Sequence, residues 1–203
     1  ASLSTFVKSL VNITLTLLLI IVVIGVLGIE TSSFIALFAS AGVAIGMALS
    51  GTLQNFAGGV MILLFKPFKV GDYIISAGAE GTVQSIDIFY TRIATTDNKV
   101  VVIPNGTISN SNVTNTTKQD ERMLVLDFTV GLNTDIAEVR EKIMELFEAD
   151  DRILHDMNKC VVVDKLTPVN IKMQAKAWTK SEDYWDVKYL LLEQISIVLQ
   201  GFR

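Results

Sequence analysis

Residues 31–65 read TSSFIALFASAGVAIGMALSGTLQNFAGGVMILLF and contain no charged side chain. The stretch holds five glycines, six alanines and four serines. Helices that face lipid are normally built from bulkier apolar residues, whereas small residues let helix backbones approach one another closely. The composition therefore predicts a membrane helix that packs against other helices over much of its surface.

Two tracks of small residues run side by side along this predicted helix. The first track is Ala36, Ser40 and Ala44, and the second is Ala39, Gly42 and Gly46. A helix with two such tracks can pack identical copies on both sides, which suits a closed ring of like helices. The alternative is a single dimer contact through Gly42 and Gly46, and the presence of two adjacent tracks favours the ring.

A narrow stripe between the two tracks would face the axis of such a ring. Val43 and Met47, four residues apart, are its largest side chains. A narrow ring of Val and Met offers water no hydrogen bonds, so a pore should dewet at that level. These two residues are candidate gate residues. The alternative is that they face lipid or a protein core, as most apolar pairs with this spacing do.

The helix is expected to be interrupted at Ser50-Gly51-Thr52, because glycine and hydroxyl residues commonly cause kinks. Residues 53–64 then read as an amphipathic segment suited to the membrane interface, with a second weak point at Gly58-Gly59. Lys66-Pro67 should end the helix, because proline disfavours a helical residue before it.

Charge is distributed very unevenly. Of the 38 acidic and basic residues, only Lys8 and Glu30 precede Lys66. The uncharged stretch from Ser9 to Ile29 would reach about 31 Å as a helix, enough to span a bilayer and longer than the apolar core of a secretory signal. By the positive-inside rule, the lysines at both ends place the charged part of the chain in the cytoplasm. The net charge of −4 gives no basic footprint for nucleic acid.

Residues 70–115 show short apolar runs separated by turn signals, which predict a barrel-like meander of about five strands. Asp97-Asn98 is a plausible two-residue hairpin turn. The run Val100–Ile103 is expected to be buried on both faces. A polar stretch from Ser109 to Asp120 would link onward.

The last third predicts strand, helix, two strands and a second helix, a compact α+β module. Thr134 or Asp135 should cap the first helix. We find no catalytic constellation and predict no enzyme activity and no cofactor. The single cysteine, Cys160, is expected in a buried strand, and the single histidine, His155, excludes a His-rich metal site.

The chain resembles the small-conductance mechanosensitive channel family (MscS-type) over nearly all of its length. The motifs that carry the resemblance are the Gly/Ala helix from Ala39 to Gly59 running into Phe65-Lys-Pro-Phe-Lys-Val-Gly-Asp72, then Gly81-Thr-Val, the hairpin from Thr91 to Asn98, Ile103-Pro-Asn-Gly106 and Tyr184-Trp-Asp-Val187. The order of these motifs makes the resemblance far more specific than a lone GxxxG.

The resemblance implies a membrane protein with four parts: a transmembrane helix (1–30), a kinked pore-lining helix (31–68), an Sm-like β domain (69–120) and an α/β cytoplasmic cage domain (121–203). It implies a homoheptamer in the bacterial cytoplasmic (inner) membrane, in contact with lipids, that opens under tension and releases ions and small solutes during hypo-osmotic shock.

Particular residues match the family position by position. Val43 and Met47 match two rings of gate residues that are usually leucines, and Gly51 and Gly59 match two glycines of the pore helix linked to kinking and inactivation. Ala39 stands where the family often has glycine. By the same resemblance, the family's first transmembrane helix and final β segment fall outside residues 1–203.

Two other classes compete with the channel. A membrane-anchored binding module could hold RNA on the Sm-like domain, but the chain is acidic and lacks an aromatic and basic cluster. A transporter would need intramembrane charges, and residues 31–65 have none.

Overall fold

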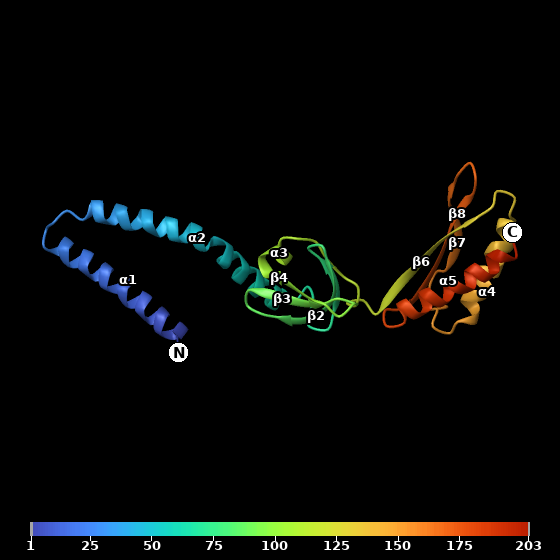
Figure 1. Cartoon of the computed structure of the whole chain (residues 1–203), viewed down its shortest axis with the longest axis horizontal. Helices are drawn as coiled ribbons and strands as arrows, with labels where there is room; N and C mark the ends of the chain where they lie inside the picture. The colour runs from blue at the N-terminus through green and yellow to red at the C-terminus, as the bar shows by residue number, and fades with distance from the viewer. Residues whose placement is uncertain (1, 203) are drawn as a thin grey trace.

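The computed structural model describes residues 2–202 and begins with two long helices, α1 (Ser2–Val26) and α2 (Ser32–Phe65). The chain reverses direction between them, and α2 then leads directly into the β-rich part (Figure 1). By length and composition, two segments of the described chain could cross a membrane, Val7–Val26 and residues 32–65. The most apolar window of each segment is exposed, whereas Gly58, Gly59 and Ile62 near the end of the second segment are buried.

Helix α2 is continuous over 34 residues. The helix is therefore not interrupted at Ser50-Gly51-Thr52, because a glycine lowers helix propensity but leaves the backbone hydrogen bonds of the helix intact. A kink or hinge at Gly51 stays a prediction. The predicted end is confirmed. Lys66 takes a left-handed conformation (φ 47°), its N–H donates to the carbonyl of Ile62 at 2.9 Å, and Pro67 follows.

A five-stranded antiparallel sheet comes next, in the order β4-β3-β2-β1-β5. Its elements are β1 (Tyr73–Ser76), β2 (Ala79–Ile86), β3 (Tyr90–Ala94), β4 (Val100–Pro104), the short helix α3 (Asn105–Ser109) and β5 (Val113–Asn115). The predicted hairpin between β3 and β4 is confirmed, but its turn is not the predicted two-residue turn at Asp97-Asn98. The N–H of Thr95 donates to the carbonyl of Lys99 at 2.9 Å, so the loop runs from Thr96 to Asn98, with Asn98 at φ 63°. The sequence analysis missed α3, and it assigned β5 to a linker because three residues between polar neighbours carry almost no periodic signal.

The prediction that Val100–Ile103 is buried on both faces is wrong. Strand β4 lies at the edge of the sheet. Ile103 is buried in the core and Val101 packs against it, whereas Val100 and Val102 on the other face are each 54% exposed. A run of four apolar residues reads the same whether one face or both are covered. This core also takes in Ile62 from α2 and Phe68 from the turn that follows it.

The last unit contains β6 (Glu121–Val130), α4 (Ile136–Ala149), β7 (Cys160–Leu166), β8 (Ile171–Lys180) and α5 (Tyr184–Gln200). The predicted βαββα order is confirmed, and the sheet order is β6-β8-β7. Asp135 caps α4, accepting hydrogen bonds from the backbone N–H groups of Ala137 (2.8 Å) and Glu138 (3.3 Å). Cys160 is half-buried rather than buried, because it begins β7 on the side of the sheet away from the core.

Candidate functional site

The first half of α2 carries all the residues predicted to form a pore. The structure brings Val43 and Met47 onto one face of the helix, where they are 63% and 74% exposed. The two small-residue tracks flank them and are exposed along their whole length. They consist of Ala36, Ser40, Ala44, Ala39, Gly42 and Gly46. This half of α2 therefore presents an uncharged and uncovered surface to lipid or to further helices.

The glycines in this half have free space around them. A Cβ atom built on Gly42, Gly46 or Gly51 would have no heavy atom of the described residues within 4 Å, apart from the helix's own backbone and chain neighbours. No contact within residues 2–202 therefore requires glycine at these positions. These positions leave room for the backbone of another helix to approach closely.

The second half of α2 is docked onto the β domain of the same chain. Gly58, Gly59 and Ile62 are buried there. A Cβ on Gly58 would lie 2.7 Å from the carbonyl oxygen of Asn105, and a Cβ on Gly59 would clash with the carbonyl of Ile88. Only glycine lets the helix backbone come this close.

Side-chain amides complete this docking contact. The Oδ1 atom of Asn55 accepts a hydrogen bond from the backbone N–H of Gly106 at 3.0 Å. The fully buried Asn105 accepts from the hydroxyl of Thr91 at 2.8 Å and donates to the carbonyls of Asp87 and Ile88 at 2.8 and 3.1 Å. The sequence analysis quoted Asn105 only as part of a family motif and did not identify either asparagine as a docking residue. Their only local signal was the Pro-Asn-Gly turn, which does not show that its partner lies 51 residues earlier.

We expect Gly59→Ala to loosen the docking of α2, because the added methyl forces the helix away from Ile88. Overpacking of this kind costs about 1–3 kcal/mol. Hydrogen–deuterium exchange should show faster exchange in residues 55–62 and in α3. Gly51→Ala is the matched control, because its methyl has open space and should leave exchange in these segments unchanged. Equal exchange in the two variants would show that close approach at Gly59 is unimportant.

The charges nearest to α2 lie just outside its two ends, with Glu30 before it and two lysines after it. Lys66 and Lys69 lie at its end, and the backbone N–H of Lys69 donates to the carboxylate of Asp72 at 3.0 Å. Two carboxyl groups of the last unit, far from α2 in the sequence, have lowered pKa values. Hydrogen bonds from Arg152 lower the pKa of Asp150, and one from Lys159 lowers the pKa of Glu148.

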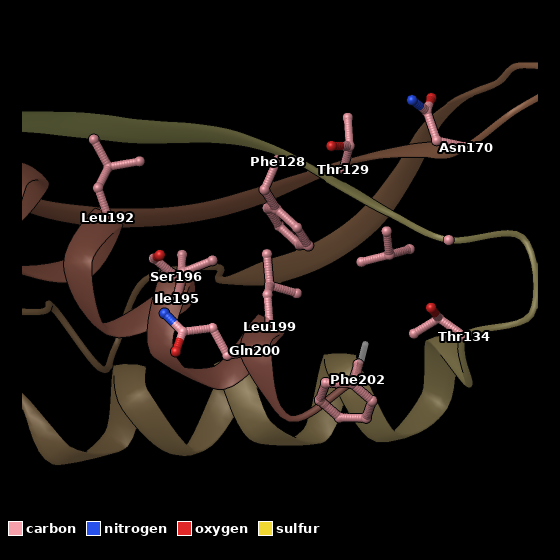
Figure 2. A pocket seen from close by; sticks show the side chains of 12 residues that line it. Phe128, Thr129, Thr134, Asn170, Leu192, Ile195, Ser196, Leu199, Gln200 and Phe202 are labelled. Atoms are coloured by element: carbon pink, nitrogen blue, oxygen red, sulfur yellow. The ribbon is translucent and has the colours of Figure 1, made fainter.

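The cavity at the far end of the last unit offers no chemistry of its own. It measures about 510 Å³ and lies between β6 and the C-terminal half of α5. Phe128 and Leu199 point toward one another across it (Figure 2). None of its described lining residues is charged, which gives it neither an acid–base pair nor a metal ligand set.

The described chain thus combines two apolar helices long enough to cross a membrane with a β-rich part docked against the second of them. Residues 51–118 match the family model described as "Mechanosensitive ion channel, beta-domain", and residues 124–200 match "Mechanosensitive ion channel MscS, C-terminal". The two models cover well over half of the chain. The chain therefore belongs to the MscS family of mechanosensitive channels, as its motifs predicted.

Individual relatives agree with this assignment. The chain is 35% identical over 162 residues to a small-conductance mechanosensitive channel of Edwardsiella ictaluri, covering 80% of this chain and 57% of that protein. It is 37% identical over 194 residues to an uncharacterized MscS family protein of Synechocystis, covering 94% of this chain and 66% of that protein. The chain thus spans about three fifths of the length of these two relatives.

A solved structure confirms the predicted fold class. The crystal structure of Helicobacter pylori MscS in its closed state matches with a TM-score of 0.87 and 28% sequence identity, covering 97% of this chain and 78% of that chain. The cryo-EM structure of Arabidopsis thaliana MSL1 shares the fold, with a TM-score of 0.79 at 16% identity, covering 97% of this chain and 73% of that chain.

Proposed function

We propose that identical copies of this protein form a ring in which α2 lines a pore that membrane tension opens. Val43 and Met47 form the gate, and the two small-residue tracks pack each α2 against its neighbours. The open pore releases ions and small solutes during hypo-osmotic shock. The protein acts as a channel and not as an enzyme.

The observation that carries this proposal is the division of α2 into two halves. Its first half is uncharged, exposed and lined with small residues, whereas its second half is fixed to the β domain through Gly58, Gly59 and Asn55. A helix held firmly at one end and free along the other can be moved by forces in the membrane. The residues proposed as the gate lie in the free half.

The finer assignments rest on family resemblance together with charge. We propose a heptamer in the bacterial inner membrane, surrounded by lipid, with the β and α+β domains in the cytoplasm. The positive-inside rule supports this orientation, since Lys8, Lys66 and Lys69 flank the two apolar segments.

The binding-module alternative is not favoured. Membership of a channel family argues against it, and the acidic balance of the chain argues against RNA as the ligand. We propose no nucleic-acid partner.

Release of a trapped dye tests the proposed function. Liposomes loaded with a small fluorescent dye and containing the purified protein should lose the dye within seconds of dilution into hypo-osmotic buffer. Without a dilution step they should retain it. Equal retention by liposomes with and without protein, at the same downshift, would contradict the proposed function.

A hinge at Gly51 is part of the proposal. Gly51→Ala removes backbone freedom and favours the straight helix by about 1 kcal/mol. If closing or inactivation bends α2 at this point, the variant should stay open longer under sustained tension. Current decay recorded at constant suction measures this, and identical decay in the wild type and the variant would rule out the hinge.

A further inference from the structure

A single connector joins the β domain to the last unit (Figure 1). It consists of residues 116–120, between the end of β5 and the start of β6. A polar stretch of this kind is commonly a mobile surface loop. How far the last unit follows a movement of α2 within one chain depends on how firmly this connector is held.

One end of the connector is fixed to the last unit by Ser181, which directly follows β8. The backbone N–H of Ser181 donates to the carbonyl of Asp120 at 2.7 Å. The hydroxyl of Ser181 donates to the carbonyl of Gln119 at 2.6 Å. The last two residues of the connector are therefore held to the last unit.

The other end is fixed to the start of β1. The N–H of Thr116 donates to the carbonyl of Tyr73 at 3.0 Å, and the hydroxyl of Thr117 accepts from the N–H of Tyr73 at 3.0 Å. The Oδ1 atom of Asn115 accepts from the N–H groups of Thr117 and Lys118 at 3.1 and 2.9 Å. Every residue of the connector is thus hydrogen-bonded, so no loose residue separates its two ends.

One carboxylate joins this connector to the turn that follows α2. The Oδ2 atom of Asp72 accepts from the side-chain amide of Asn115 at 2.7 Å and from the backbone N–H of Lys69 at 3.0 Å. Asp72 is buried and forms no ion pair with any described residue. A buried carboxylate needs such N–H donors, and hydrogen bonds to a charged group are among the stronger ones in proteins.

We propose that Asp72 is a positioning residue of the channel, which couples the last unit to α2 through Asn115. A chain of hydrogen bonds then runs from the turn after α2, through Asp72 and the connector, to Ser181. When α2 moves, the last unit moves with it, and the free energy of opening includes the movement of both. This coupling rests on the tension-gated pore of the proposed function, and its test is separate from that of the pore.

Asn115→Asp tests the coupling, because it places a second carboxylate against that of Asp72. The backbone pairing of β1 with β5 uses neither side chain, so the β domain should still fold. We expect a lower threshold suction in patch recordings, because α2 can then move without the last unit. A threshold equal to that of the wild type, or above it, would overturn the coupling.

Gln174→Glu is the matched control. The Nε2 atom of Gln174 donates to the carboxylate of Asp127 at 2.9 Å inside the sheet of the last unit. This variant therefore also opposes two carboxylates, but away from the connector, and its threshold should equal that of the wild type. An equal lowering of the threshold in this control would show that the effect does not come from the contact at Asp72.

The double variant Asp72→Asn with Asn115→Asp provides a rescue. It again places one amide opposite one carboxylate, so its threshold should return toward that of the wild type. A double variant with a threshold as low as that of Asn115→Asp alone would contradict the assignment to this contact.

Two measurements keep the outcomes distinct. Native mass spectrometry establishes that each variant forms the same oligomer as the wild type. If Asn115→Asp does not assemble, Asp72→Asn alone takes its place, because it keeps the size of the side chain and removes its charge, and a smaller lowering is expected. A wild-type protein without tension-gated current would refute the proposed function, whereas wild-type current with an unchanged threshold in the assembled variant rejects the coupling alone.

Discussion

Val43→Thr is expected to open at lower membrane tension than the wild-type channel and to leak at rest. Threonine keeps the branched shape of valine and adds a hydroxyl that can bond to pore water. One hydrogen bond is worth about 0.5–1 kcal/mol net, and a ring repeats it in every subunit. The sum reaches several kcal/mol in favour of the wetted pore. The measurement is the suction at which single-channel currents first appear, and cells that express the variant should grow poorly.

Two further variants locate the constriction. Ile45→Thr makes the same kind of change on the opposite side of α2 from Val43, and it should leave the threshold unchanged. Met47→Ser should act in the same direction as Val43→Thr, although it also removes bulk. An early opening of Met47→Ser alone would place the constriction at Met47 and not at Val43. Wild-type thresholds in both variants would mean that this stripe does not face the pore.

Gly42→Leu and Gly46→Leu are each expected to prevent the ring from closing. In one chain these positions have open space, so the leucine should not disturb the fold of the monomer. Between copies, it would hold apart backbones that small residues allow to meet. We expect smaller or mixed oligomers in native mass spectrometry and loss of tension-gated current.

Ile45→Leu is the control for these two variants. It places leucine on the same helix but away from both small-residue tracks, at a residue that is already 60% exposed. Its oligomer and its current should match the wild type. Normal assembly and normal current in both glycine variants would refute the packing role of the tracks.

The sequence predicted much of the fold because its signals were local or periodic. The strand β8, the cap at Asp135 and the hairpin that contains Asn98 each depend on neighbouring residues. The end of α2 could also be predicted from neighbouring residues, because Pro67 disfavours a helical conformation at Lys66. The family motifs supplied what periodicity could not, namely the association of these elements with a channel.

The docking of α2 could not be predicted from local signals. Gly59 looked like a point of weakness, yet in the folded chain it is where the helix touches Ile88 and Asn105. The contact joins residues far apart in the sequence. The sequence also does not distinguish a glycine needed for close approach from a glycine needed for bending. The exposure of Val102 could not be predicted for a similar reason. Whether β4 lies at the edge of the sheet depends on which strands pair with it, and these strands come from other parts of the sequence.

The central claim is that membrane tension opens a pore lined by α2. Patch recordings from liposomes that contain only lipid and the purified protein test it most directly, because no other cell component can supply the response. The account predicts current steps that appear above a threshold suction and disappear when the suction is released. Current that does not depend on suction would contradict the claim. So would patches that contain verified oligomers and rupture without showing any current.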